Sequence, residues 1–322
     1  RSLKEAEAGA HWKDWKHYSS IDTKTLHALW DDPERQKDQL FWVWIQQKLD
    51  VQFLQAAKHI TSLGIILKGD LPILMNEDSC DVWAHPEYFD RKLAAGAPPD
   101  MFSPLGQNWQ FPIYNWDRLA QEDYSWWRER LKAADAYYAA YRIDHVLGFF
   151  RIWAASRSDF SAVSGRFIPS LPIYREELFQ LGFDEGRIRW LSQPHISTDA
   201  LYAALERAGI QSEELDSEVS KACSRLLKRV GTEELWLFKK EVIGERFIDA
   251  QGLNEALSCF LQEAWRNRTL LEYTEGEFCS AWSYWDTQAF QSLSEEEKQK
   301  LEQLITHKKH ESEKLWEDQG RI

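Results

Sequence analysis

A helical segment that leads directly into a short apolar strand occurs twice in this sequence. Apolar residues recur at helical spacing over residues 38–62, and the run Ile65-Ile66-Leu67 follows, ending in the segment 68–72. A second helical pattern covers residues 123–140 and leads into a strand at 141–144. A helix that feeds a strand in this way indicates parallel α/β structure, so we predict a buried strand that starts at Ile65 and carries Asp70 at its C-terminal end.

Each predicted strand carries an aspartate at its end, Asp70 in the first unit and Asp144 in the second. In a barrel of parallel strands the catalytic groups lie at the C-terminal strand ends. Alternate strand residues share a face, so Arg142 and Asp144 point one way and Ile143 the other. If Ile143 packs against helices, Arg142 keeps a carboxylate on its own face ionised and able to act as a nucleophile, and His145 offers a hydrogen bond to a sugar hydroxyl. A structural ion pair at a strand end is the alternative.

The connecting segments differ along the chain. Residues 78–116 are rich in Gly, Pro, Asn and Asp, and long irregular loops are where functional residues concentrate. After about Gly148 a Pro-containing stretch at 167–172 precedes mostly helical patterns from residue 199 onward. The later part therefore has the character of a helical insertion.

A capping box opens the last helix that the sequence predicts. Ser294 is followed three residues later by Glu297, which predicts a helix from there to about Lys309. The charged tail at 308–321 is interpreted as a solvated helix rather than a binding patch.

The composition excludes several classes of function. A net charge of -13, from 52 acidic and 39 basic residues, repels phosphate backbones, so nucleic acid is not an expected partner. No run of 18 apolar residues occurs and the first residues lack the pattern of a secretory signal, so we expect a soluble, cytoplasmic protein without a membrane partner. The histidines are scattered, and the pair His307 and His310 is interpreted as surface rather than metal-binding.

The cysteines show neither CxxC spacing nor the density of a disulfide scaffold. We predict that all four are reduced core thiols; they are Cys80, Cys223, Cys259 and Cys279.

Five sequence blocks occur in one order along the chain. They are Gly69-Asp70-Leu71-Pro72-Ile73, Asp78-Ser79-Cys80-Asp81-Val82-Trp83, Ala95-Gly96-Ala97-Pro98-Pro99-Asp100, Gly106-Gln107-Asn108-Trp109, and Tyr141-Arg142-Ile143-Asp144-His145 with Gly148-Phe149. In this order they resemble the 4-alpha-glucanotransferases, which are the amylomaltases and disproportionating enzymes of the glycoside hydrolase family 77 type. The resemblance runs from residue 11 to 322 and is closest to the subtype with a helical insertion after the nucleophile strand.

The resemblance implies a (β/α)8 TIM-type barrel, partial in this chain, with a mainly helical insertion. Residues 1–155 would be part of the catalytic barrel, including the donor loop at 78–116. Residues 156–322 would be the insertion, leading back towards the missing barrel half. The implied activity is retaining transfer of α-1,4-glucan segments from a donor maltodextrin to an acceptor glucan or glucose, with no cofactor and no metal.

The resemblance also assigns roles to single residues. Asp144 matches the nucleophile, Arg142 and His145 are its neighbours, and Asp70 matches a carboxylate that binds the sugar in the cleaving subsite. The loop over the donor glucan would include Asp100, Gln107 and Trp109. A turn carboxylate before Pro72 is the alternative for Asp70, and loop packing is the alternative for Trp109.

These residue types suit the implied chemistry. Retention requires a nucleophile and a separate acid/base roughly 5 Å apart, with a covalent glycosyl intermediate between the two half reactions. Transfer outcompetes hydrolysis when water is kept away from the intermediate. The aromatic share of 14% is high, and aromatic faces such as those of Phe102 and Trp109 stack on sugar rings.

The sequence departs from the family pattern at several places. Gln110 replaces a glycine, Met101 stands where tyrosine is common, and Ala154-Ala155-Ser156-Arg157 replaces a Pro-containing turn. No Glu-Asp-Leu-Gly block supplies the acid/base glutamate, and no His-Asp block supplies the later carboxylate. We therefore expect an internal fragment that is nearly inactive alone, because general acid catalysis contributes about 10² to 10⁴ in rate.

Two other functions remain open at this stage. The first is a non-catalytic maltodextrin-binding protein that keeps the aromatic loop but lacks the acid/base. The second is a hydrolase of the α-amylase group, against which the absence of an Asn-His pair near Asp70 counts.

Overall fold

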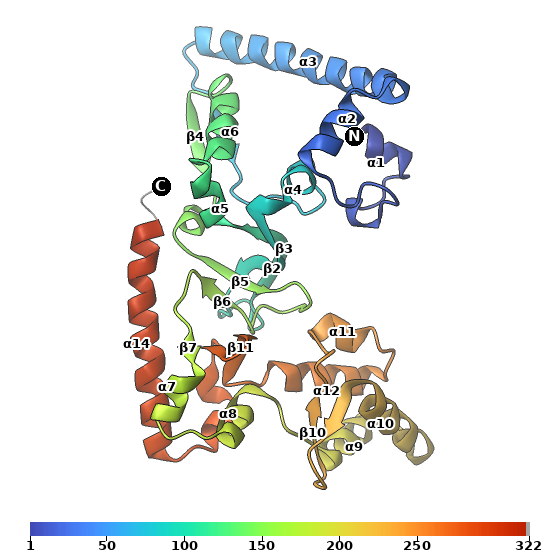
Figure 1. Ribbon diagram of the computed structural model, residues 1–322, viewed down its shortest axis with the longest axis vertical. Coiled ribbons are helices and arrows are strands. Elements are labelled where there is room, and N and C mark those ends of the chain that lie inside the picture. Colours follow the sequence, from blue (N-terminus) through green and yellow to red (C-terminus); the bar gives the residue numbers. More distant parts are fainter. Residues whose placement is uncertain (320–322) are drawn as a thin grey trace. The chain divides into compact units, whose positions relative to one another are not determined.

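The computed structural model describes residues 1–319, with the side chains of residues 213, 318 and 319 excepted. The chain forms two compact units, and each is assembled from two stretches of sequence. The first unit contains Arg1–Lys92 and Gln110–Gly148, and the second contains Leu93–Trp109 and Phe149–Ile322. Both units combine helices with short strands (Figure 1), which confirms the predicted α/β class at this level.

The first unit is dominated by helices. Its α-helices are α1 (Ser2–Ala6), α2 (Thr23–Trp30), α3 (Pro33–Ser62), α4 (Cys80–Ala84), α5 (Trp116–Gln121) and α6 (Ser125–Asp135). Its 3-10 helices are η1 (Trp12–Asp14) and η2 (Pro86–Tyr88), with η3 (Val146–Phe149) at its end. Two strands, β1 (Lys68–Leu71) and β4 (Ala140–Ile143), lie wholly within it.

The strands β1 and β4 form a parallel pair, as the recurring helix-then-strand units predicted. The register sets Lys68 opposite Ala140 and Leu71 opposite Ile143. Gly69 is required in β1 because a Cβ there would lie 2.3 Å from the Cδ2 atom of Tyr138, the residue two before β4. The close approach of Tyr138 to β1 is therefore possible only without a side chain at position 69.

The strand predicted to end at Asp70 forms as β1, but its predicted start at Ile65 is wrong. Ile65 and Ile66 are 55% and 73% exposed, and β1 begins only at Lys68. The backbone bond from Ala139 N to Leu67 O, at 3.0 Å, is the first that links this segment to the residues leading into β4. A β-branched run forms a strand only where a neighbouring strand supplies ladder bonds, and β4 does so three residues later than the pattern suggested.

The predicted helix at 38–62 forms and is longer than expected. Asp32 caps α3, since its Oδ1 accepts from Glu34 N at 3.0 Å, and Pro33 occupies the first turn. The expected amphipathic packing is not seen among the described residues, where the only buried residue of α3 is Ala57. Side chains of the predicted apolar face are 40% to 54% exposed; they are Leu40, Trp44, Leu49 and Phe53.

A small antiparallel sheet organises the start of the second unit. Its strand order is β3-β2-β5-β6, where β2 is Phe89–Ala97, β3 is Gln107–Tyr114, β5 is Ile152–Ser156 and β6 is Arg166–Ile168. Residues Leu93–Gly96 of β2 pair with Trp153–Ser156 of β5. Trp153 and Ala155 from β5 pack with Ala162, and Phe167 and Trp282 cover this cluster.

The rest of the second unit has two hydrophobic clusters, and strands are present in both. One cluster combines β7 (Ile173–Tyr174), α7 (Arg175–Gln180), α8 (Glu185–Ser192), β11 (Leu270–Thr274), β12 (Glu277–Ser280), η4 (Tyr284–Asp286), α13 (Gln288–Gln291) and α14 (Glu295–Gln319). The other combines β8 (Ile196–Ser197), α9 (Thr198–Arg207), α10 (Ser212–Leu226), β9 (Leu227–Arg229), β10 (Leu235–Phe238), α11 (Glu245–Asp249) and α12 (Glu255–Arg266). Three-stranded sheets β11-β12-β7 and β8-β10-β9 belong to them, and no sheet within residues 1–319 closes into a barrel.

The capping box predicted at Ser294 is confirmed. Ser294 N donates to Glu297 Oε2 at 2.8 Å, and Glu297 N donates to Ser294 Oγ at 3.3 Å. Helix α14 continues past Lys309 to Gln319, so the predicted tail helix forms as far as the chain is described.

The cysteine prediction is half correct. All four thiols are free, but Cys80 and Cys259 are exposed rather than in a core, while Cys223 and Cys279 are partly buried. The two exposed thiols lie on α4 and α12, and the spacing of cysteines in the sequence does not indicate which side of a helix faces solvent. Among residues 1–319, no helix combines the length and the apolar content that crossing a membrane requires.

Replacement of Glu297 tests what holds α14 to the rest of its cluster. Arg187 donates from Nε and Nη2 to the Glu297 carboxylate at 2.8 and 2.7 Å, and the bond to Arg187 is the main cause that lowers the pKa of Glu297 to about 2. We expect Glu297→Gln to lower the free energy of unfolding by about 1 to 2 kcal/mol at pH 7, from the lost cap and ion pair. Urea unfolding measures this difference.

The pH dependence of that difference has a fixed sign. A carboxylate with a lowered folded-state pKa stabilises the fold above its ordinary pKa of 4.5, and this stabilisation is lost as pH falls towards 2. The gap between parent and Glu297→Gln should therefore shrink from pH 5 to pH 3. Glu295→Gln is the control, because the Glu295 side chain is 91% exposed, and a gap independent of pH would contradict the assignment.

Candidate functional site

Asp70 and Arg142 meet across the parallel strand pair. They are register partners, and Arg142 Nε donates to Asp70 Oδ1 at 3.1 Å while Nη2 donates to Oδ2. The hydrogen bond to Asp70 is the main cause that raises the pKa of Arg142, with a smaller electrostatic contribution from Asp144. The side chains are 62% and 52% exposed, so the pair adds little stability but leaves both groups open to a ligand.

Asp144 is the first residue after β4 and is exposed. Within residues 1–319 its carboxylate forms neither a hydrogen bond nor an ion pair. Arg142 pairs with a carboxylate as expected, and the partner is Asp70 on the neighbouring strand rather than Asp144. Ile143 does not pack against helices, since it is 44% exposed. Asp144 therefore lies beside a positive charge that another carboxylate anchors.

The chain turns sharply directly after Asp144. His145 has a φ of 53°, in the left-handed region that residues with a Cβ seldom adopt, and such strain is common at functional sites. Gly148 N donates to His145 O at 2.8 Å, and a Cβ at Gly148 would lie 3.0 Å from both His145 Cδ2 and Ile73 Cδ1. This packing sets the His145 ring against the segment that follows β1.

The segment after Asp70 is held by side chains from two other elements. Arg130 Nη2 of α6 donates to Pro72 O at 2.6 Å, and the Tyr114 hydroxyl of β3 donates to Ile73 O. The Arg130 guanidinium lies over the rings of Trp126 and Trp127, with centroid distances of 5.3 and 4.9 Å. The strand end that carries Asp70 is thus braced against α6.

The loop between β2 and β3, residues 98–106, is shaped by Asp100. Asp100 Oδ1 accepts from Phe102 N at 2.8 Å and from Ser103 N at 2.7 Å, an Asx-type turn. This turn leaves the neighbouring side chains of Met101 and Phe102 85% and 86% exposed. The loop therefore presents an apolar tip while its acidic residue faces its own backbone.

Gln107 and Trp109 interact at the start of β3. Trp109 Nε1 donates to Gln107 Oε1 at 3.0 Å, which fixes the partly buried indole relative to the strand. Gly96 of β2 must be a glycine because a Cβ there would lie 2.1 Å from Gln107 O. Close contact between β2 and β3 thus positions both predicted sugar-binding side chains.

Asn108 lies between these residues and was not among the predicted site residues. Its Nδ2 donates to Ser156 O and Asp159 O, each at 3.0 Å, and so ties β3 to the turn that follows β5. Its place inside the Gly-Gln-Asn-Trp block was the available signal, but a side chain that binds backbone carbonyls 48 and 51 residues away cannot be foreseen from spacing.

The predicted site residues fall into two groups. The first unit brings Asp70 and Arg142 into contact and carries Asp144 and His145 on the same strand end. The second unit contains the other three, which are Asp100, Gln107 and Trp109.

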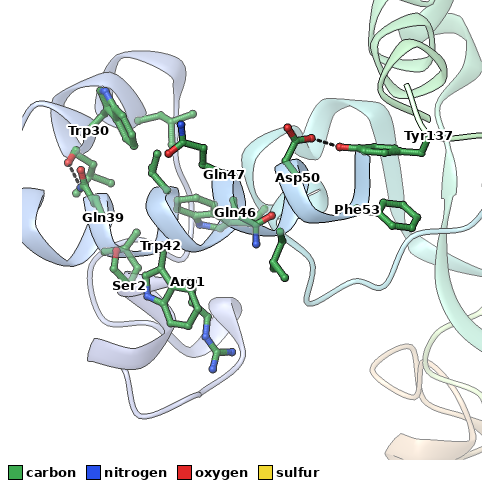
Figure 2. A pocket seen from close by; sticks show the side chains of 16 residues that line it. Arg1, Ser2, Trp30, Gln39, Trp42, Gln46, Gln47, Asp50, Phe53 and Tyr137 are labelled. Atoms are coloured by element: carbon green, nitrogen blue, oxygen red, sulfur yellow. Dashed lines mark hydrogen bonds between the residues drawn. The ribbon is translucent and has the colours of Figure 1, made fainter. Parts of the chain in front are cut away.

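A pocket of about 1100 Å³ lies along α3 and contains none of the predicted site residues. Figure 2 shows its labelled side chains, with the Tyr137 hydroxyl bonded to Asp50 and the Phe53 ring beside Tyr137. The ring centroids of Phe53 and Tyr137 are 4.8 Å apart. The lining includes Leu49 and Phe53 from the exposed apolar residues of α3, together with polar side chains such as Gln46 and Asp50.

Metal ligation has no candidate in the described part of the chain. No group of three or more His, Cys, Asp or Glu side chains in residues 1–319 is arranged to hold an ion.

Comparison with known proteins identifies the family. A family model for 4-alpha-glucanotransferase matches residues 1–187. The 4-alpha-glucanotransferase DPE2 of Oryza sativa subsp. japonica is 33% identical over 308 residues, covering 90% of this chain and 31% of that protein. The 4-alpha-glucanotransferase of Chlamydia pneumoniae is 45% identical over 133 residues, covering 41% of this chain and 24% of that protein. The amylomaltase from Streptococcus agalactiae in complex with acarbose gives a TM-score of 0.47 at 20% identity, over 83% of this chain and 70% of that one.

Because the family model covers more than half of the chain, the chain belongs to the 4-alpha-glucanotransferase family. This confirms the resemblance on which the sequence assignment was based. The chain spans 31% of the length of the rice relative and 24% of the chlamydial one.

The close contact between β2 and β3 is tested by Gly96→Ala. A Cβ at 2.1 Å from Gln107 O forces the strands apart, so we expect a loss of about 1 to 3 kcal/mol in the free energy of unfolding. Urea unfolding gives the value. Gly186→Ala in α8 is the matched control and should change stability by less than about 1 kcal/mol. Equal effects of the two substitutions would contradict the described packing.

Proposed function

We propose that this chain contributes the nucleophile half of a retaining transglycosylase that moves α-1,4-glucan segments from a donor maltodextrin to an acceptor glucan or glucose. The observation that supports this is the geometry of one strand end. Asp144 follows β4 with an exposed carboxylate, next to an Arg142 guanidinium that Asp70 anchors from β1. A carboxylate that is exposed, free of other partners in residues 1–319 and beside a fixed positive charge suits attack on a sugar carbon.

In the proposed reaction the Asp144 carboxylate attacks the anomeric carbon of the donor, and the bond to the leaving glucan oxygen breaks as a general acid protonates that oxygen. A glycosyl–Asp144 ester forms. The hydroxyl oxygen of an acceptor sugar then displaces the carboxylate and gives its proton to the same acid/base group, so the configuration is retained and the group is restored. No residue of this chain is assigned as that acid/base group. Arg142 orients Asp70 through two hydrogen bonds, and its positive charge interacts with Asp144 electrostatically. Each oxygen of the Asp70 carboxylate accepts one hydrogen bond from Arg142, and each has a further lone pair that can accept a hydrogen bond from a sugar hydroxyl.

The second group of predicted residues is proposed to bind the donor. The β2–β3 loop presents Phe102, and β3 presents the indole of Trp109, which is held by Gln107. Apolar and aromatic faces of this kind stack on sugar rings and exclude water from the intermediate. His145 and Asp100 are proposed to contribute hydrogen bonds to sugar hydroxyls.

We further propose that β1 and β4 are strands of a (β/α)8 barrel and that residues 1–155 are its catalytic part, with residues 156–322 as an insertion. The support is that each strand follows a helix, α3 or α6, and that the two pair in parallel. A two-stranded parallel pair is marginal by itself, and the exposed apolar residues of α3 and of 63–66 require a cover.

The nucleophile assignment is tested by Asp144→Asn in the longest reading frame that contains these residues. After incubation with maltotriose, chain-length analysis should show glucose and longer dextrins from the parent. The variant should lose at least about 10³-fold in rate, because an amide cannot form the ester intermediate. Asp117→Asn, an exposed aspartate of α5, is the matched control and should retain parental activity. Parental activity in Asp144→Asn would reject the assignment.

The role of the missing acid/base is tested with residues 1–322 alone. We expect transfer at least about 10²-fold slower than in the longer reading frame, since no glutamate of this chain is assigned to protonate the leaving oxygen. Product analysis under matched protein concentrations measures the ratio. Comparable activity from the 322 residues would show that a glutamate within them supplies the proton.

A non-catalytic maltodextrin-binding protein is the second candidate. The exposed apolar tip of the β2–β3 loop, at Met101 and Phe102, favours it, because such a tip can bind a glucan without a catalytic step. No residue of this chain is assigned as the proton donor that catalysis requires. Saturable binding of maltotriose without any product, from the longest reading frame, would select it over the enzyme.

A further inference from the structure

A buried carboxylate in the second unit holds the turn on which the β2–β3 loop rests. Glu245 opens α11 and is fully buried. Its Oε2 accepts from Phe160 N at 2.7 Å and from Ser161 N at 2.8 Å, and its Oε1 accepts from Ser161 Oγ at 2.9 Å. Arg266 at the end of α12 supplies the counter-charge, with Nη1 at 2.8 Å from Oε1. A buried carboxylate is retained only when its charge and lone pairs are satisfied in this way.

The turn at 156–162 also accepts hydrogen bonds from the backbone N–H groups of α11. Arg246 N donates to Ser158 O at 2.8 Å, and Glu245 N donates to Asp159 Oδ1 at 2.9 Å. Gly244 is pressed against the turn, because a Cβ there would lie 2.5 Å from Ser158 O. Residues 244–246 and the turn thus form one closely fitted contact.

Asp159 adds a second buried carboxylate to this contact. It is 3% exposed, its Oδ1 also accepts from Trp265 Nε1 at 3.1 Å, and burial raises its pKa to about 6. The partly buried Arg268 interacts with it electrostatically, and its Nη2 donates to Ser164 Oγ at 3.3 Å. The two acids and two arginines form a compact charged cluster around the turn.

The opposite side of the turn contacts the proposed sugar-binding segment. Asn108 binds the carbonyls of Ser156 and Asp159, and Ala162 N donates to Leu105 O at 2.9 Å. Gly106 packs there as well, since a Cβ at that position would lie 3.1 Å from Ala162 Cβ. By contrast, the bonds of Asp100 and Ser103 are internal to the loop and only shape it.

We infer that Glu245 is a positioning residue that fixes the β2–β3 loop and Trp109 for donor binding through the turn at 156–162. This inference rests on the proposed glucan transfer. The family model ends at residue 187, so Glu245 and Arg266 lie in the part of the chain that the model does not match. The later part of the chain therefore acts on the donor-binding segment through Glu245 and the contacts around it.

The expected consequence separates binding from chemistry. The hydrogen bonds of the Glu245 side chain are made within the second unit, whereas Asp70 and Asp144 belong to the first, so we expect the loss of Glu245 to leave those carboxylates unchanged. A looser β2–β3 loop binds the donor less well and admits water to the intermediate. We therefore expect a higher KM and a larger share of hydrolysis, with kcat little changed.

The test uses Glu245→Gln in the longest reading frame. Glutamine keeps the shape but places an NH2 group among donors, so the contacts to Phe160 N and Ser161 N are weakened. With maltotriose, KM should rise about tenfold while kcat stays within about threefold, and the ratio of hydrolysis to transfer should increase. Glu241→Gln is the control, since Glu241 is exposed four residues earlier. An unchanged KM and product ratio would overturn the inference.

Hydrogen exchange provides a readout that does not depend on activity. The amides of Gly106 and Ala162, bonded to Ser103 O and Leu105 O, should exchange at least about fivefold faster in Glu245→Gln, while those of α9 stay protected. If the parent shows no transferase activity but these amides still exchange faster in Glu245→Gln, the proposed function is rejected and the positioning role is kept. Unchanged exchange at these amides would overturn the positioning role.

A second variant covers the case in which Glu245→Gln does not fold. Asn108→Ala breaks the path on the loop side of the turn and should raise KM and loop exchange in the same direction. When both single variants fold, their effects on KM in the double variant should be less than additive, because they interrupt one path. Full additivity would show that the two residues act independently.

Discussion

The parallel register of β1 and β4 is the constraint on which the candidate site depends. It places Asp70 opposite Arg142, and the planar guanidinium then binds the carboxylate with two parallel bonds. Without that register Arg142 would face Asp144 from two residues along the same strand. The cross-strand pair occupies Asp70 with Arg142 and leaves Asp144 exposed near the same positive charge, so the two carboxylates have different surroundings.

A second constraint comes from charges buried in the second unit. Glu245 and Asp159 are almost completely removed from water, and such groups are tolerated only with fixed partners. Leaving either carboxylate unpaired would cost free energy, and this cost favours one arrangement of the turn at 156–162. Leu105 and Asn108 are hydrogen-bonded to that turn. Electrostatics in the interior therefore define the position of a surface loop, although no charge of that cluster reaches the loop itself.

Much of the local structure followed from short patterns. The capping box at Ser294 and Glu297 and the helix ending at residue 62 were predicted because each depends on neighbours in sequence. The parallel pairing of β1 and β4 was predicted because the helix-then-strand unit recurs, but its register was not. Predictions that required knowledge of packing were less accurate. Ile65 and Ile66 are exposed because β4 pairs further along the chain, and α3 leaves its apolar side uncovered within residues 1–319.

The sequence by itself determined the residue types at the strand ends, the glycines at 69 and 96, and the ordered blocks that identify the family. Only the tertiary structure decided that Arg142 pairs with Asp70, and that Asn108 binds a turn held by Glu245. The physical reason is that the cross-strand register joins residues 72 positions apart, and that hydrogen bonds of buried carboxylates join residues 84 to 86 positions apart. Their energies depend on distance in space and on exclusion of water, and neither quantity can be obtained from spacing along the chain.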